Sequence, residues 1–191
     1  DYDRADCYGM IGEVLSYKGK YEEALRSIQK AVDIAQKAGD EENVMHHIWQ
    51  KAMVFAAQRR YDEAEAEYRR IIPFYEKNDE TKYLARVYSD LCDMYIEKEN
   101  YAGAVSYGEM ALHLWKKVGD RYQTMQCFQS LSKAYRWTNL KNAYVYRLKY
   151  DSLKELIYSD KQNDLLVKYE TAEKERVIEN QQSAIYEQVP D

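Results

Sequence analysis

Apolar residues recur every three or four positions over most of the chain, which is the spacing of one helix face rather than the alternation of a β-strand. The first two stripes, separated by Gly19, are Tyr8, Ile11, Gly12 and Leu15, then Ala24, Ile28, Ala31, Val32 and Ala35. Gly39 stands where the second helix should end, and Asp40 is suited to cap the next helix. Residues 5–39 are therefore predicted to form a hairpin of two helices.

This block returns at a fixed interval. Residues 19–24 (GKYEEA) reappear as residues 60–64 (RYDEA) and 100–104 (NYAGA), so that Ala24, Ala64 and Ala104 lie 40 positions apart. A fourth, eroded copy at residues 139–143 (NLKNA) places Ala143 only 39 positions after Ala104. A repeat of this length is typical of a solenoid. One repeat position, which we call the small slot, holds a small residue in every unit: Gly12, Ala52, Cys92 and Ser132. A small residue at this position predicts a close approach of two helices there.

Each unit has the same order of residues: a small residue, an aromatic residue or Leu, the Tyr-x-x-Ala step, and a closing Ala or Ile. This order resembles the tetratricopeptide repeat, whose units have 34 residues. The units here have 40 residues, so the chain is closer to the long-unit variants of that family, over about residues 5–158. The resemblance implies an all-α, right-handed superhelical solenoid of about four helical hairpins plus a C-terminal helix. Lys51 stands where the family has Leu, and Gly108 and Arg147 stand where it has a large apolar residue.

The predicted units lie near residues 5–39, 40–79, 80–119 and 120–158, and residues 159–191 form a polar C-terminal helix, either a cap or a connector. Ser159 and Asp160 offer a fresh helix cap. The later segment carries only a thin apolar seam, made of Leu165, Leu166, Tyr169, Ala172, Val177, Ile178 and Ile185. We expect its first half to dock on the repeats and its second half to project into solvent or to pair with another chain.

Composition agrees with long helices, since 32% of the residues are charged and there are only 7 Gly and 2 Pro. The net charge of -5 comes from interleaved acids and bases, so there is no basic stripe and nucleic acid is not expected as a partner of this fragment. The longest apolar run, residues 52–57, is far short of the roughly 20 residues that a membrane span needs. Because the chain opens on Asp1, we expect it to be excised from a longer polypeptide.

No Gly-rich phosphate loop, Gly-x-Ser-x-Gly elbow or His-Glu-x-x-His motif is present, so we predict neither an enzyme nor a bound cofactor or metal. Adjacent His46 and His47 would point about 100° apart on a helix and are interpreted as part of a polar face. Three scattered cysteines are too few for a disulfide framework. We expect Cys7, Cys92 and Cys127 to be free thiols that serve as small packing residues.

In proteins of the family that this chain resembles, the first helices of successive units line a concave groove. The matching positions are Glu13, Tyr17, His46, Trp49, Gln50, Met53, Arg86, Ser89, Asp90, Asp93, Gln126, Gln129, Lys133, Arg136 and Trp137. From them we take as candidate peptide-binding residues Tyr17, His46, Trp49, Met53, Arg86, Asp90, Asp93, Gln129, Lys133 and Arg136. We expect Trp49 and Trp137 to be exposed or half exposed there, and the alternative for Trp49 is packing on a neighbouring helix. Gly9, Glu13 and Gln50 replace the residues by which chaperone-binding members hold a terminal carboxylate, which argues against such a partner.

Residues 164–176 resemble the charged helix that follows repeat arrays in bacterial membrane-bound sensor kinases and transcriptional regulators. This resemblance implies a protein- or peptide-binding module that is the sensory input region of a bacterial signalling or transcription-regulating protein. The alternative is a free-standing adaptor that scaffolds protein complexes. The compartment follows from that choice, being extracytoplasmic for a membrane-bound sensor and cytoplasmic otherwise. A homodimer through the C-terminal helix is a further expectation.

Overall fold

The computed structural model describes residues 2–186, with side chains for residues 4–172 and 174–176. These residues form helices and no strand. In order, the helices are α1 (Tyr2–Tyr17), α2 (Tyr21–Ala38), α3 (Glu41–Ala57), α4 (Tyr61–Lys77), α5 (Thr81–Glu97), α6 (Tyr101–Val118), α7 (Arg121–Tyr135) and α8 (Leu140–Tyr186).

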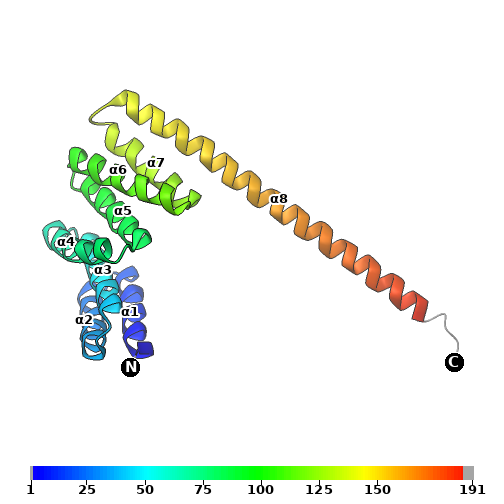
Figure 1. The fold of residues 1–191 in the computed structure, drawn as a ribbon, viewed down its shortest axis with the longest axis horizontal. Coiled ribbons are helices and arrows are strands. Elements are labelled where there is room, and N and C mark those ends of the chain that lie inside the picture. Colours follow the sequence, from blue (N-terminus) through cyan, green and yellow to red (C-terminus); the bar gives the residue numbers. More distant parts are fainter. Residues whose placement is uncertain (1, 187–191) are drawn as a thin grey trace.

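Successive helices pack as four hairpins that stack into a solenoid, with α1 and α2 at one end and α7 and α8 at the other (Figure 1). Each helix contacts the next one along the chain. In addition α1 contacts α3, α3 contacts α5, and α5 contacts α7, so the first helices of the hairpins form one continuous layer. The predicted all-helical solenoid is confirmed.

Small residues allow the two helices of each hairpin to approach closely. A methyl group added at Gly12 would clash with Cγ1 of Ile28, so the Ile28 side chain of α2 packs directly against the backbone of α1. In the fourth hairpin the Ser132 hydroxyl donates to the Ala143 carbonyl over 3.0 Å. The equivalent positions in the second and third hairpins, Ala52 and Cys92, are buried. The small slot therefore has the role that its spacing predicts.

The first six connections, one every 20 residues, each contain a residue in the left-handed region. Gly19, Gly39 and Gly119 occupy three of these positions with φ of 73°, 72° and 80°. The other three hold Arg59, Asp79 and Glu99, with φ of 59°, 55° and 58°. Asp40 caps α3 as predicted, because its carboxylate accepts from the Asn43 amide over 3.1 Å.

The residues that depart from the family pattern each have a local partner. Lys51 pairs with Glu67 on α4, with 2.8 Å between Nζ and Oε1. A methyl group added at Gly108 would lie 2.7 Å from Cδ2 of Leu131, so the missing side chain lets α6 and α7 meet. Arg147 Nε donates to Asp151 one turn further along α8 over 3.0 Å.

Two of the three cysteines are buried and one is exposed. All three are free thiols, and Cys92 and Cys127 are buried as expected. Burial raises the pKa of the Cys127 thiol to about 11, while the hydrogen bond with Ser89 acts to lower it. Cys7 is exposed, so the prediction that it is a packing residue is wrong. It lies on the outer side of the first helix, which has no preceding unit among the described residues to cover it.

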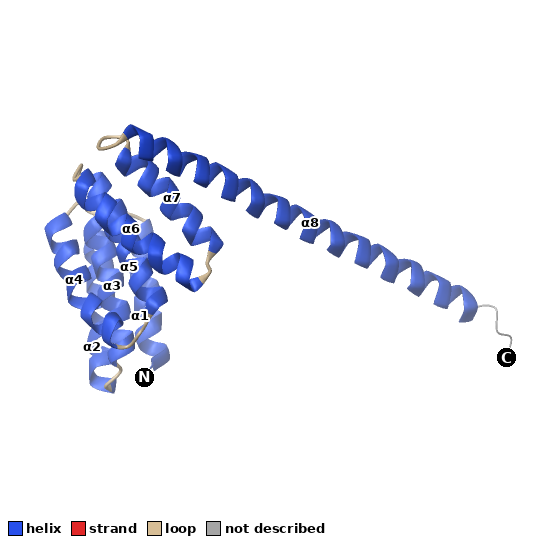
Figure 2. Cartoon of the chain, turned by 45° about the horizontal axis from the view of Figure 1, so that its top comes forward, coloured by secondary structure: helices blue, strands red, loops and turns tan. Residues whose placement is uncertain are grey.

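The expectation that residues 161–172 dock on the repeats is wrong. α8 runs without a break through Ser159 and Asp160, and Leu165 and Tyr169 are 70% and 66% exposed. Both views show α8 leaving the stack beyond α7 (Figures 1 and 2). A straight helix stays beside α7 only for the length of α7, which has 15 residues. Asp160 of α8 still contacts the repeats, since its carboxylate accepts from Arg121 at the start of α7 over 2.9 Å.

The side chains of Val177, Ile178 and Ile185, which complete the predicted seam, lie outside the described residues. The division into a repeat array and a polar segment at residue 159 stays a prediction, since α8 belongs to both parts. Over the part of the chain that the structure describes, no helix is both long enough and apolar enough to cross a membrane.

The left-handed turns generate a stability prediction. Glu99→Gly should raise the free energy of unfolding by about 1 kcal/mol, because a side chain in this conformation clashes with its own backbone. The matched control is Arg26→Gly, which replaces another exposed charged residue but within the interior of α2, and should lower stability by about 1 kcal/mol. Urea denaturation measures both. A loss of stability in Glu99→Gly would contradict this account of the turn.

Candidate functional site

The layer of first helices carries one groove built from two adjoining hollows. The larger hollow, of about 580 Å³, lies over α3, α5 and α7, and its polar lining includes Ser89, Asp90, Asp93, Glu97, Gln123, Gln126, Gln129, Ser130 and Lys133. The smaller one, of about 390 Å³, shares Met53, Ser89, Asp90 and Gln123 with it and adds Glu13, Tyr17, Trp49, Arg86 and Trp115. We refer to the two together as the groove.

Trp49 forms the floor of the groove rather than a protruding anchor. It is only 9% exposed and belongs to the main hydrophobic core. Its indole Nε1 donates to Oδ2 of Asp90 on the next first helix over 2.6 Å. The guanidinium of Arg86 lies 5.1 Å from the ring centroid, a cation–π contact. The expected exposure of Trp49 is therefore wrong and the packing alternative is correct, because α5 lies directly against it.

Two carboxylates beside Trp49 have altered acidity. Burial raises the pKa of Asp90 to about 7, opposed by the Trp49 hydrogen bond and by Arg86 and reinforced by Asp93. Burial also raises the pKa of Asp93, while the Ser130 hydroxyl, which donates to it over 2.6 Å, and Lys133 act in the opposite direction. At neutral pH the groove therefore holds a carboxyl group that is poised between its two protonation states.

Polar contacts tie each first helix to the next. Gln50 donates to Glu13 between α3 and α1, and Ser130 donates to Asp93 between α7 and α5. The Ser89 hydroxyl accepts from Trp115 of α6 over 2.9 Å. Neither Ser130 nor Trp115 is found by the sequence argument, because Trp115 comes from a second helix and Ser130 follows the matched position by one residue. The bonds of Gln50 and Ser130 fix the register of neighbouring units, and the bond of Trp115 joins the two helices of the third hairpin.

The structure brings eight of the ten candidate residues into the groove. Tyr17, Trp49, Met53, Arg86, Asp90, Asp93, Gln129 and Lys133 line it. His46 instead lines a separate pocket near the start of α3. Arg136 lies at the end of α7, with its guanidinium 6.0 Å from the ring of Trp137. Trp137 is exposed as expected, but its ring stacks on Tyr101 with centroids 5.6 Å apart.

The interpretation of the His pair as a polar face is wrong for His47, which is 1% exposed and faces α1. His46 is half-buried, and burial followed by the neighbouring His47 lowers its pKa. No cluster of three or more His, Cys, Asp or Glu side chains suited to a metal ion occurs among the residues described. The site thus offers hydrogen bonds, charge and apolar contact, which are the means of binding another molecule.

Comparison with known proteins places the first two hairpins in a family. Residues 3–77 match the family model described as tetratricopeptide repeat, so this part of the chain is a member of that family. Such arrays are scaffolds for protein interaction rather than enzymes. The two later hairpins continue the same architecture, with the last helix beginning one residue early.

Solved structures extend this similarity along the chain. BtubC (BKLC) from P. vanneervenii superposes with a TM-score of 0.74 at 20% identity, over 83% of this chain and 66% of that one. A signal transduction ATPase with numerous domains (STAND) protein with a tetratricopeptide repeat sensor, from Pyrococcus horikoshii, superposes with a TM-score of 0.67 at 19% identity. That match covers 84% of this chain and 25% of the STAND protein. At such identities the likeness establishes the fold alone. A search of curated proteins found no match.

The altered acidity of Asp90 has a measurable consequence. The ordinary pKa of an Asp carboxyl is 3.8, and that of Asp90 in the folded chain is about 7. At pH values between these two, the folded chain holds a proton on Asp90 that the unfolded chain has released. The stability from this group is therefore fully present below about pH 4 and is lost as the pH rises to about 7. Asp90→Asn keeps an acceptor for Trp49 without the charge, so it should remove this decline.

Urea denaturation at several values between pH 4 and pH 8 tests the Asp90 prediction. The difference in free energy of unfolding between Asp90→Asn and the parent should grow in favour of the variant as the pH rises. Asp33→Asn, at an exposed carboxylate of α2, should keep the profile of the parent. A constant difference between Asp90→Asn and the parent would show that Asp90 does not titrate in this window.

Proposed function

We propose that the groove binds an extended peptide or a partner segment. The observation that carries the proposal is the groove itself, which gathers residues from four first helices in one hollow surface. The half-exposed thioether of Met53 offers an adaptable apolar contact. Gln126 and Gln129 supply amides that can both donate to and accept from a peptide backbone.

The charges of the groove would orient the bound segment. Arg86 and Lys133 are exposed and lie on different first helices, α5 and α7. The carboxylates of Asp93 and Glu97 on α5 also line the groove. A segment with acidic and basic residues in the complementary order would meet opposite charges along its length, which favours one direction of binding over the other.

A display selection of random peptides against the whole chain tests this function. Selected peptides should lose roughly tenfold or more in affinity when Met53 and Lys133 are both changed to Ala, since central contacts of an interface contribute at least about 1 kcal/mol each. The matched control is Met110→Ala with Lys117→Ala, two exposed residues of α6 outside the groove. The proposal fails if the selected peptides bind the groove variant as tightly as they bind the parent.

We further propose that this module is the sensory input region of a signalling or transcription-regulating protein. Support comes from α8, which continues beyond the repeats as a polar helix and would link a repeat rearrangement to a following segment. The STAND protein is described as having a tetratricopeptide repeat sensor, which is consistent with this role. The alternative, a free-standing adaptor, predicts a stop codon soon after Asp191. A hydrophobic run encoded there would support a membrane-bound sensor instead.

A homodimer through α8 is part of this proposal. Exposed Tyr158, Leu165 and Ala172 lie seven residues apart, and Tyr169 lies four residues after Leu165. This is the spacing by which two helices pair in a coiled coil. Leu165, Tyr169 and Ala172 lie beyond the contact of Asp160 with Arg121 of α7, so a second copy can reach them.

Sedimentation analysis tests the dimer. The parent chain should form dimers at protein concentrations of up to about 100 µM. The double variant Leu165→Glu with Tyr169→Glu should remain monomeric, because four negative charges would face one another between the two α8 helices. Met110→Glu with Val118→Glu, at exposed positions of α6, is the matched control and should associate like the parent. A monomeric parent at this concentration would contradict the proposal.

A further inference from the structure

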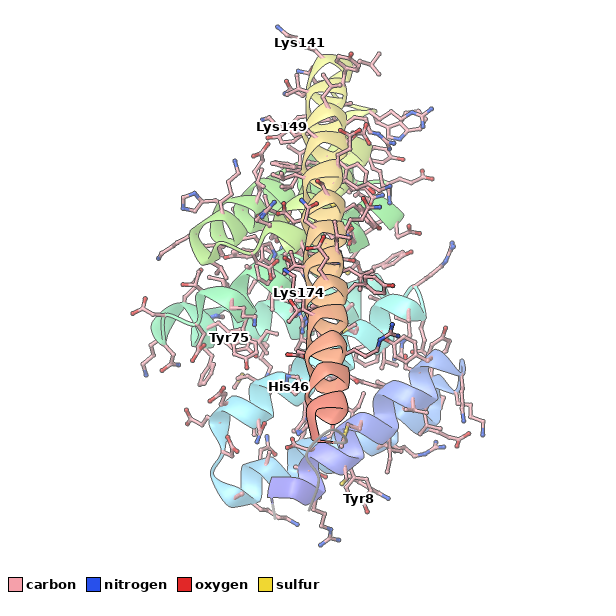
Figure 3. The ribbon with its side chains drawn as sticks, turned by 90° about the vertical axis from the view of Figure 1, so that its right-hand side faces the viewer. Tyr8, His46, Tyr75, Lys141, Lys149 and Lys174 are labelled. Atoms are coloured by element: carbon pink, nitrogen blue, oxygen red, sulfur yellow. The ribbon has the colours of Figure 1, made fainter. Side chains whose placement is uncertain are left out.

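A second pocket, of about 460 Å³, lies beside the groove and shares only Glu13 with it. Four helices contribute to it: α1, the start of α3, the end of α4 and the start of α5. Its lining is Asp6, Met10, Glu13, Glu42, Asn43, His46, His47, Gln50, Tyr75 and Tyr83. Figure 3 marks His46 and Tyr75, which come from different hairpin helices of the second unit.

A chain of hydrogen bonds fixes the tautomer of His47. Gln50 Nε2 donates to Glu13 Oε1 over 3.0 Å, and a reversed amide would instead put its oxygen against that carboxylate. Gln50 Oε1 is thereby the atom that faces His47 Nδ1, at 2.9 Å. Nδ1 must then carry the hydrogen. In the neutral ring, Nε2 is left with a lone pair and can only accept.

That acceptor has no partner among the described residues. His47 Nε2 is fully buried and makes no hydrogen bond. Oδ1 of Asp6 lies 3.9 Å from Nε2 and is also an acceptor. Two acceptors at this separation can both accept from one donor placed about 2.8 Å from each. An unsatisfied buried polar atom is costly, so this gap favours a bound donor.

The pocket also favours positive charge. Three carboxylates line it, those of Asp6, Glu13 and Glu42, and the lining contains no Lys or Arg. The rings of Tyr75 and Tyr83 stack with centroids 5.3 Å apart and form an aromatic wall. Burial, the largest cause, raises the pKa of Tyr75, so its phenol stays neutral. Carboxylates and aromatic faces together attract a cation.

Gly9 shows that this arrangement depends on close helix packing. A methyl group added there would lie 2.8 Å from both Gln50 Oε1 and His47 Cε1. Glycine therefore lets α1 press against the two α3 residues that set the His47 tautomer. The acceptor pair is held by two helices rather than by a loop, which keeps its geometry fixed.

We propose that this pocket binds a primary ammonium group, which donates to His47 Nε2 and Asp6 Oδ1 together. The ammonium can belong to a lysine side chain of a bound protein or to a free alkylamine, since both present the same three donors. This inference goes beyond the groove function, because the pocket is separate and would bind an amine whether or not a peptide occupies the groove.

Titration of the whole ¹⁵N-labelled chain with n-butylammonium chloride near pH 8 tests the site. The His47 Nε2 resonance should shift saturably as the lone pair accepts a hydrogen bond. Asp6→Asn should weaken binding by about tenfold or more, the usual effect of losing a charge-assisted hydrogen bond. Asp6 is exposed, so this variant should fold. Asp33→Asn, an exposed carboxylate of α2 outside the pocket, is the matched control and should bind like the parent.

His47→Asn provides a second variant, because the Asn amide can keep the donor toward Gln50 while the Nε2 acceptor is lost. It should abolish butylammonium binding, followed through the backbone amides of Asp6 and His46. Two probes distinguish a lysine side chain from a free amine. If Nα-acetyl-lysine methylamide binds at least as tightly as butylammonium, the site recognises a lysine side chain. If only butylammonium binds, the site recognises free amines.

Three outcomes would overturn the proposal. One is the absence of a saturable shift with either amine. Another is an equal shift with 1-butanol, which would show that the gap holds any small donor such as water. The third is an unchanged affinity in Asp6→Asn. None of these results bears on peptide binding in the groove, so the two proposals are judged separately.

Discussion

Everything in this structure depends on how closely the two helices of each hairpin approach. Gly12 against Ile28 leaves no room for a methyl group, and Ser132 bonds to the backbone of Ala143. Interaxial distance is set by the side chains at the contact, so one small residue per unit holds the hairpin closed. Because the hairpins are alike and reverse at every twentieth residue, they stack in line and place all first helices in one layer.

The groove follows from that layer. Its walls are the first helices, and its register is set by polar bonds that cross from one unit to the next, such as Trp49 to Asp90 and Ser130 to Asp93. The Asp90 carboxylate and the Trp49 indole thus link the stacked helices to the groove. A shift of α5 against α3 would move Asp90 and Arg86 together, so the shape and the charge of the groove change as one.

The sequence predicts what depends on local spacing. The hairpins are predicted from the 40-residue period and the small slot. The helix caps are predicted from Gly39 and Asp40, which end α2 and begin α3. The sequence does not predict which side of a helix faces the next unit. Trp49 and His47 are three-dimensional neighbours of α5 and α1, and only packing across units buries them. The exposure of Leu165 likewise follows from where α7 begins, at Arg121, which an apolar seam in α8 alone cannot reveal.

The length of α8 gives small motions a large effect. Beyond Asp160 it extends for another 26 residues to Tyr186, about 40 Å at the rise of an α-helix. A change of only 5° in the angle between α8 and α7 would displace the far end by roughly 3 Å, more than half the pitch of a helical turn. A small change in packing where α8 contacts α7 thereby becomes a larger translation at Tyr186.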